Sequence, residues 1–339
     1  MLIKDNMFFS EGVRLQALLV CTMTNNNEIV ENGRTASEGD PSNQREITQS
    51  FIRRYAIQYI SPVIITIAIS LLFTLPISIT GFYVPILPFT PEMYPDNPAV
   101  PALLNTAFFM LIAVLGAVLV VFLLRRHKDI LYKLLLTFGL LFSGTVILWY
   151  FFDATISALN VYTIENQLIV IIVSFTLGSI LMYLTVHYKA SFLRNLAVVI
   201  YGGLIGAFLG PNIWTWTVVL ILIALSLYDI YGVRKGPIRE IILTIEQRRR
   251  EIPILTYTSR DWEIGIGDLA FYSMFTSHIF TQYGVTAFLL VTVGIVIGSL
   301  ITLKLLEKKG MLPGLPIPIA LGLVGFILFF IISIFVPLI

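Results

Sequence analysis

Two aspartates, Asp229 and Asp268, are the only carboxylates within the long apolar stretches of this 339-residue chain. Asp229 follows Leu-Tyr, and Asp268 ends the sequence Gly-Ile-Gly-Asp. An ionisable side chain in hydrocarbon costs at least about 2.5–3.5 kcal/mol on insertion scales, so such residues usually have a function. Two of them in one chain predict a joint role.

The chemistry of such a pair follows from its environment. Two carboxyl groups within hydrogen-bond distance in a low-dielectric site cannot both ionise cheaply, so they share one proton. One then acts as a base and the other as an acid. A water between them can be deprotonated and directed at a carbonyl carbon while the protonated partner polarises the oxygen. The pair therefore predicts peptide hydrolysis without a covalent intermediate.

The chain is that of a polytopic membrane protein. It is 57% hydrophobic and 12% charged, with a mean hydropathy of +0.88. A helix needs roughly 20 apolar residues to cross about 30 Å of hydrocarbon. We predict an all-α membrane bundle of nine transmembrane helices. The nine spans lie near residues 58–80, 103–124, 130–152, 168–186, 195–212, 214–233, 265–283, 285–303 and 316–337.

Lys and Arg residues assign the two sides of the membrane. All 22 of them fall in the N-terminal tail or at alternate loops, and the opposite loops contain none. The N-terminus is therefore predicted to be cytoplasmic and the C-terminus external. Asp229 lies five residues before Arg234, and Asp268 five residues after Glu263. Both acids are then about 7–8 Å inside the cytoplasmic boundary, at one depth.

An intramembrane acid pair has a competing function, which is proton or cation coupling in a transporter. Transporters often have inverted repeats and bind their ions near the bilayer midplane. This chain shows no internal repeat, and its acids lie towards the cytoplasm. We therefore favour hydrolysis, with transport as the alternative.

The segments outside the spans have different characters. Residues 1–52 are predicted to be a disordered cytoplasmic tail, and the proline-rich loop 81–102 an ordered or interfacial external cap. The cytoplasmic loop 234–264 has two parts. Residues 237–250 have the pattern of an amphipathic helix on the membrane surface, or simply of a positive-inside loop. Residues 252–258 are β-branched and aromatic, so an extended segment is expected.

Other protease chemistries lack their motifs. The three histidines stand alone without a His-Glu-x-x-His pattern, and the chain has one cysteine, so no metal and no other cofactor is predicted. Ser273 and Ser277 lie near His278, but no Gly-x-Ser-x-Gly accompanies them. We expect His278 to be a hydrogen-bonded packing residue.

Glycines and prolines surround the acid pair. Gly265 and Gly267 give the seventh span a bare first turn, through which another backbone can approach Asp268. Their alternative role is helix packing. The last span opens with Leu-Pro-Gly-Leu-Pro-Ile-Pro over residues 312–318. This stretch is predicted to be extended and to offer backbone groups to a substrate, or else to be only a proline-marked helix start.

Taken together, Tyr228-Asp229, Gly265-Ile266-Gly267-Asp268 and Pro313-Gly314-Leu315 resemble the presenilin and signal peptide peptidase family. These are the Gly-x-Gly-Asp intramembrane aspartyl proteases. The family pattern at the ninth span is Pro-Ala-Leu, so Gly314 departs from it and adds backbone freedom. The cytoplasmic N-terminus favours a presenilin-like homologue. The short loop between the acids favours a stand-alone, prokaryotic-type, archaeal one.

The resemblance implies a protease domain over residues 53–339 with Asp229 and Asp268 as its catalytic acids. It implies single-span transmembrane helices as substrates, in a lipid bilayer, with no nucleic acid and no obligatory partner subunit. Because a membrane helix hides its peptide bonds until it unwinds, an unwound segment could pair with an exposed edge. We expect residues 252–258, with Leu255 and Thr256 among them, on one side of it and Leu315 on the other. The predicted substrate-binding residues are Tyr228, Leu255, Thr256, Gly265, Gly267, Pro313, Gly314, Leu315 and Pro316.

Overall fold

The structure is a computed structural model. It describes residues 2–3, 41–94, 97, 99–126, 128–161, 163–188, 191–235, 255–259, 262–309 and 312–335. The predicted amphipathic helix 237–250 lies outside the described residues, as does most of the predicted tail. The tail boundary itself differs from the prediction, because the first helix begins at Pro41, within residues 1–52. Proline suits a helix start, where its missing N–H leaves no bond unmade.

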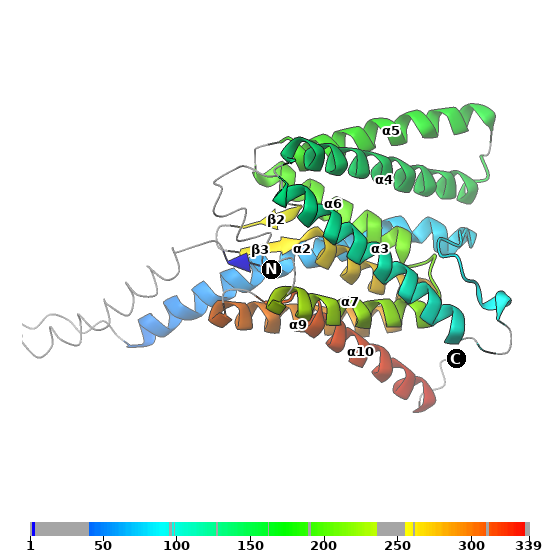
Figure 1. Cartoon of the computed structure of the whole chain (residues 1–339). Coiled ribbons are helices and arrows are strands. Elements are labelled where there is room, and N and C mark those ends of the chain that lie inside the picture. The colour runs from blue at the N-terminus through cyan, green and yellow to red at the C-terminus, as the bar shows by residue number, and fades with distance from the viewer. Residues whose placement is uncertain are drawn as a thin grey trace, which may run out of the picture.

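The described chain is an all-helical bundle with one small sheet at one end (Figure 1). Its helices are α2 (Pro41–Thr80), α3 (Ala99–Arg125), α4 (Asp129–Ala158), α5 (Ile164–Val186), α6 (Ser191–Leu209), α7 (Thr215–Lys235), α9 (Ile266–Lys309) and α10 (Pro316–Phe335), with a short 3-10 turn η2 (Pro91–Met93). Eight helices in the described part of the chain are long and apolar enough to cross a membrane. The predicted fold class is confirmed.

The difference between eight helices and nine predicted spans lies in α9. This helix has 44 residues, but Gly284 interrupts it with φ 79° and ψ −171°, a conformation that suits only glycine. A Cβ on Gly322 of α10 would lie 3.1 Å from Phe275 and 3.0 Å from Ile295. Those two residues would be about 30 Å apart on a straight helix. The chain therefore reverses at Gly284, between the predicted seventh and eighth spans.

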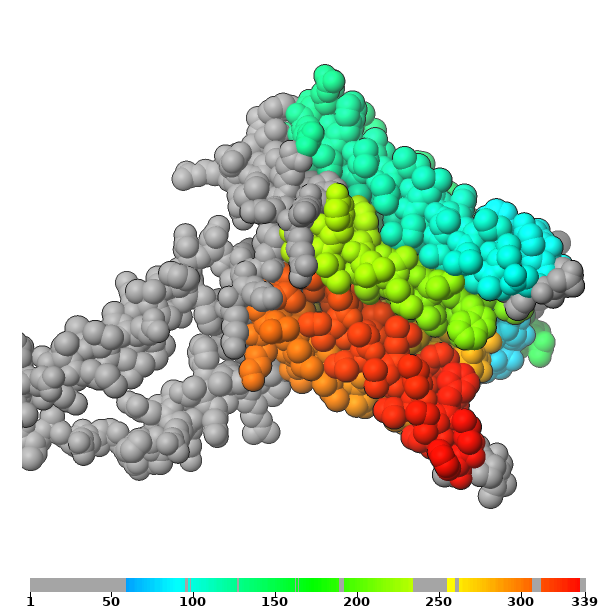
Figure 2. Space-filling view, turned by 60° about the horizontal axis from the view of Figure 1, so that its bottom comes forward, coloured from blue at the N-terminus to red at the C-terminus, as the bar shows by residue number. Residues whose placement is uncertain are grey.

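The exterior of the bundle is apolar, as a membrane protein requires. Leucine, isoleucine and phenylalanine side chains of α3, α5 and α10 are exposed along these helices. Figure 2 shows one such face, on which α3, α7 and α10 lie side by side. Helix α3 is the least buried of the described spans.

The interior is organised around the first part of α9, which packs on α2 and α6. Gly202 and Gly206 of α6, and Gly210 directly after it, face α9, and their small size lets the two backbones approach closely. Ser273 donates a hydrogen bond to the Gly202 carbonyl, and Ser277 donates one to the Gly206 carbonyl. This contact fixes the helix that carries Asp268.

The loop predicted to be a cap is ordered over the described residues 81–94. The Val84 N–H donates to Asn212, and Tyr150 donates its hydroxyl proton to the Phe82 carbonyl. Asn105 holds Phe89 through both its amide nitrogen and its oxygen. The ordered loop predicted there is confirmed.

A three-stranded sheet leads directly into α9. Its order is β1 (Leu2–Ile3), β3 (Trp262–Gly265) and β2 (Thr256–Thr258), and both pairings are antiparallel. Strand β3 ends at Gly265 and α9 begins at Ile266, without a linker. The extended segment predicted at 252–258 is confirmed for β2, and residues 252–254 lie outside the described part.

Candidate functional site

The two aspartates approach each other from different helices. Asp229 lies near the end of α7, and Asp268 is the third residue of α9. Both are partly buried, and the two carboxyl groups interact electrostatically. Both side chains also contact the same segment, Gly314–Leu315, which precedes α10. Contacts to this common element bring the two acids together, and their common depth in the membrane stays a prediction.

Asp229 is oriented by backbone N–H groups. Its Oδ2 accepts a hydrogen bond of 3.0 Å from the Leu315 N–H, and the Gly314 amide interacts with the same carboxyl group. Bonds from N–H donors to a carboxylate are charge-assisted and stronger than those between neutral groups. The Asp229 carboxyl group is therefore held by backbone N–H groups of the segment that precedes α10.

Asp268 owes its position to the start of α9. It lies in the first turn, where the helix dipole favours a negative charge. Its carboxyl group also accepts from the Gly265 N–H, three residues earlier. An acid at the third helical position that accepts from the N–H of the residue before the helix makes one of the two hydrogen bonds of a capping box. The Gly-x-Gly-Asp sequence thus makes a helix start that orients its own acid.

Gly314 allows close contact with Asp268. A methyl group at residue 314 would overlap Asp268 Oδ2 and lie 2.7 Å from its Cγ. The carboxyl group therefore packs directly against the Gly314 backbone. This changes the interpretation of Gly314, whose importance here is the absence of a side chain rather than added backbone freedom.

Residues 313–315 are non-helical, and α10 begins at Pro316. The extended conformation predicted for residues 312–318 is wrong beyond Pro313, because residues 314–315 form a bend and residues 316–318 already lie in α10. The alternative, a helix start marked by prolines, describes the segment better, and Leu315 accepts a hydrogen bond of 3.0 Å from the Ile319 N–H. Two further backbone groups of this segment already have partners. The Leu315 N–H donates a hydrogen bond to Asp229, and the Gly314 carbonyl accepts one of 2.8 Å from the Tyr272 hydroxyl. In the structure these two groups are thus bound within the protein, and their use by a substrate stays a prediction.

The remaining predicted residues are placed as follows. Tyr228 is partly exposed, and successive helical side chains diverge by about 100°, so it does not share the direction of Asp229. Around Gly265 and Gly267, added Cβ atoms would meet no atom closer than 3.8 Å. These glycines do not pack against a helix, so the packing alternative is not supported. Leu255 accepts from the Ile266 N–H at 2.9 Å.

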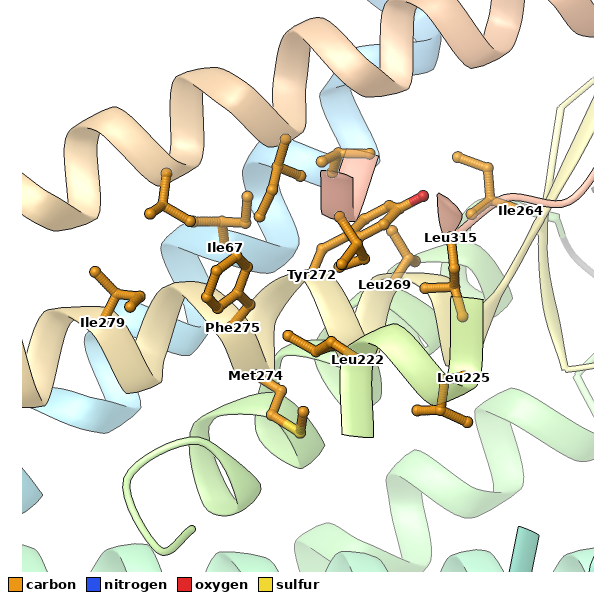
Figure 3. Packing of buried hydrophobic residues seen from close by; sticks show 14 of the residues in the cluster. Ile67, Leu222, Leu225, Ile264, Leu269, Tyr272, Met274, Phe275, Ile279 and Leu315 are labelled. Carbon is orange, nitrogen blue, oxygen red and sulfur yellow. The ribbon is translucent and has the colours of Figure 1, made fainter. Parts of the chain in front are cut away.

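Two residues near the site escaped the sequence analysis. Tyr272 lies one turn after Asp268, and its 2% exposure makes it part of the core in Figure 3. Asn195 of α6 binds both backbone groups of Thr258, at 2.7 Å and 3.0 Å. The i+4 spacing from Asp268 could have identified Tyr272. No local signal identifies Asn195.

His278 is a packing residue, as predicted. Its ring nitrogens lie 2.9 Å from the Gly210 carbonyl and 3.0 Å from the Thr215 hydroxyl. The hydroxyls of Ser273 and Ser277 donate to backbone carbonyls rather than to this ring. The arrangement does not form a serine nucleophile with its base.

Comparison with known proteins gives a consistent result. A family model described as Presenilin matches residues 51–264, more than half of the chain. The match includes Asp229 and ends one residue before Gly265. Presenilin-B from Dictyostelium discoideum is 27% identical over 188 residues, which are 52% of this chain and 38% of that relative. The chain thus matches well under half of that relative's length.

Solved structures share the fold. Two structures of a presenilin family intramembrane aspartate protease, in space groups C222 and P2, each superpose with a TM-score of 0.56 at 16% sequence identity. The likeness covers 80% and 81% of this chain, respectively, and 97% of each solved chain. It establishes the architecture, while the role of each residue rests on the geometry above.

We predict that Gly314→Ala lowers the rate of substrate cleavage by about tenfold, because the added methyl displaces the Asp268 carboxyl group. Cleavage of a single-span substrate and the Tm in detergent would be measured together. Gly116→Ala is the matched control, since its Cβ would have no atom within 4 Å. Full activity in the Gly314 variant would show that Asp268 does not depend on this contact.

Proposed function

This chain belongs to the presenilin family, and from that membership we propose that it is an intramembrane aspartyl protease. It hydrolyses peptide bonds within or near the transmembrane helices of other membrane proteins. The observation that carries the proposal is the convergence of Asp229 and Asp268 on the Gly314–Leu315 peptide. No observation on the described residues favours the transporter alternative.

The mechanism uses a water between the two carboxyl groups. The ionised carboxylate takes a proton from the water as its oxygen forms a bond to the substrate carbonyl carbon. The protonated carboxyl donates a hydrogen bond to the carbonyl oxygen and stabilises the tetrahedral intermediate. The C–N bond then breaks, and the leaving nitrogen receives a proton from the pair. The shared proton belongs to both acids, so neither is assigned a fixed role.

An unwound substrate segment requires a backbone partner, and β2 provides one. Antiparallel strands alternate in the direction of their backbone groups. Leu255 and Ser259 bind β3, so Thr256 and Thr258 point to the outer edge. Asn195 occupies the groups of Thr258, which leaves those of Thr256 for the substrate. In this proposal Leu255 supports the edge, while Tyr228, Gly265, Gly267, Pro313 and Pro316 border the space around the dyad.

The far side of the sheet is arranged differently. There β1 pairs with β3, with Leu2 opposite Glu263. Leu315 was expected to be a second docking edge, but its N–H is held by Asp229. We therefore assign the main substrate pairing to Thr256, and to Leu315 the orientation of the dyad.

The proposed membrane orientation follows the charge distribution, with a cytoplasmic N-terminus, an external C-terminus and the dyad towards the cytoplasm. Cys21 is the only cysteine in the chain and lies in the N-terminal tail. A membrane-impermeant maleimide should label it only after cells are permeabilised. Labelling of intact cells would reverse the assigned orientation.

The proposed domain is residues 53–339, together with the earlier start of α2. The proposed substrates are single-span helices, and no partner subunit is required. The purified chain should therefore cleave such a helix in liposomes without added protein. The archaeal origin inferred from the sequence stays a prediction.

We predict that Asp229→Asn and Asp268→Asn each lower cleavage by about 10²–10⁴-fold, because the pair loses either its base or its acid. Asp153→Asn on α4 is the control and should cleave at the wild-type rate. If the dyad variants cleave normally, the protease assignment fails. If no variant or wild type ever cleaves while the same substitutions abolish ion flux, the transporter is correct.

We predict that Thr256→Pro raises KM roughly three- to tenfold, because it removes one outward N–H from the docking edge. The ladder between β2 and β3 keeps its bonds, since those come from other residues. Thr256→Val keeps the N–H and changes only the side chain, so it is expected to have the wild-type KM. Equal KM values in the two variants would remove Thr256 from the substrate site.

A further inference from the structure

One peptide group beside the dyad is held at both of its ends. The Tyr272 hydroxyl donates to the Gly314 carbonyl at 2.8 Å, and the Leu315 N–H donates to Asp229 Oδ2 at 3.0 Å. This carbonyl and this N–H belong to the same peptide bond. Because a peptide group is planar and rigid, fixing the carbonyl also fixes the direction of the N–H. The tyrosine thus acts on Asp229 through one intervening peptide.

Tyr272 is also tied to the other acid. It lies four residues after Asp268 on α9, so the two side chains lie on the same helical face. Its ring is buried among apolar side chains, and in Figure 3 its hydroxyl points towards the segment that carries Leu315. Ser299, from the second part of α9, is a further neighbour of this hydroxyl. The ring therefore has little freedom to move.

The same short segment also touches Asp268 directly. Because Gly314 has no side chain, the Asp268 carboxyl group can pack directly against the Gly314 backbone. Two residues of α9 therefore contact the 314–315 segment. Asp268 packs against the Gly314 backbone, and Tyr272 donates a hydrogen bond to the Gly314 carbonyl. Asp229 of α7 accepts a hydrogen bond from the Leu315 N–H of the same segment. The position of one acid relative to the other is transmitted through this segment.

We propose that Tyr272 is a positioning residue, which sets the orientation of the Asp229 carboxyl group relative to Asp268 by holding the Gly314–Leu315 peptide. It acts without touching the substrate. The inference rests on the proposed catalytic dyad. Loss of its hydroxyl leaves the packing of the ring intact and frees the peptide to rotate, so the water between the acids is held less well.

The test removes only the hydroxyl, by Tyr272→Phe in the purified full chain. The matched control is Tyr201→Phe, because Tyr201 is fully buried and donates to the Leu140 carbonyl at 2.9 Å, between α6 and α4. Both variants lose a buried hydrogen bond to a backbone carbonyl, and Tyr272→Phe also loses the contact of its hydroxyl with Ser299. Measurements of kcat, KM and Tm are made in liposomes or detergent with one single-span substrate.

Tyr272→Phe is expected to lower kcat by roughly ten- to a hundredfold with KM within about twofold of wild type. Tyr201→Phe is expected to keep the wild-type kcat, although its Tm falls to a similar extent. A wild-type kcat in Tyr272→Phe overturns the inference. So does an equal loss of kcat in both variants that follows their Tm, which would mean a merely structural role.

The dyad variants distinguish a failure of the positioning role of Tyr272 from a failure of the proposed function. If Asp229→Asn and Asp268→Asn are inactive while Tyr272→Phe is fully active, the positioning role fails and the dyad stands. If the dyad variants are active, the proposed function itself fails.

Discussion

The peptide group between Gly314 and Leu315 is the element on which the site depends. Two acids in a membrane require partners that compensate for lost hydration, and the Leu315 N–H is such a partner for Asp229. That N–H leaves the acid free to react, whereas a buried Lys or Arg would hold it in an ion pair. This arrangement requires precise geometry, because a single backbone segment must contact both carboxyl groups at once.

The rest of the fold keeps this segment in place. The reversal at Gly284 returns the chain so that α10 packs along both parts of α9. The glycines of α6 fix the first part of α9, and Asn195 of the same helix holds the strand that pairs with β3. Strand β3 then passes into α9 without a linker. The proposed substrate edge, the proposed catalytic acid Asp268 and the Gly314–Leu315 segment are therefore linked by direct contacts and by chain continuity.

Much of this arrangement could be predicted from the sequence. Continuous apolar runs defined the spans, and Gly284 marked the break between two of them. The extended character of residues 256–258 and the packing role of His278 were also predictable, because each depends on local sequence. Tyr272 and Asn195 were not found, because their partners are 42 and 63 residues away and single polar residues in apolar helices are common. The use of the Leu315 N–H by Asp229 likewise depends on a contact between distant helices.

The most direct test is an experimental structure of the chain with a helical peptide whose scissile bond is replaced by a hydroxyl-bearing isostere. We predict that the hydroxyl lies within hydrogen-bond distance of both Asp229 and Asp268, with the Leu315 N–H still bound to Asp229. Carboxyl groups more than about 10 Å apart, with the isostere bound to neither, would contradict the account, because no water could then serve both acids.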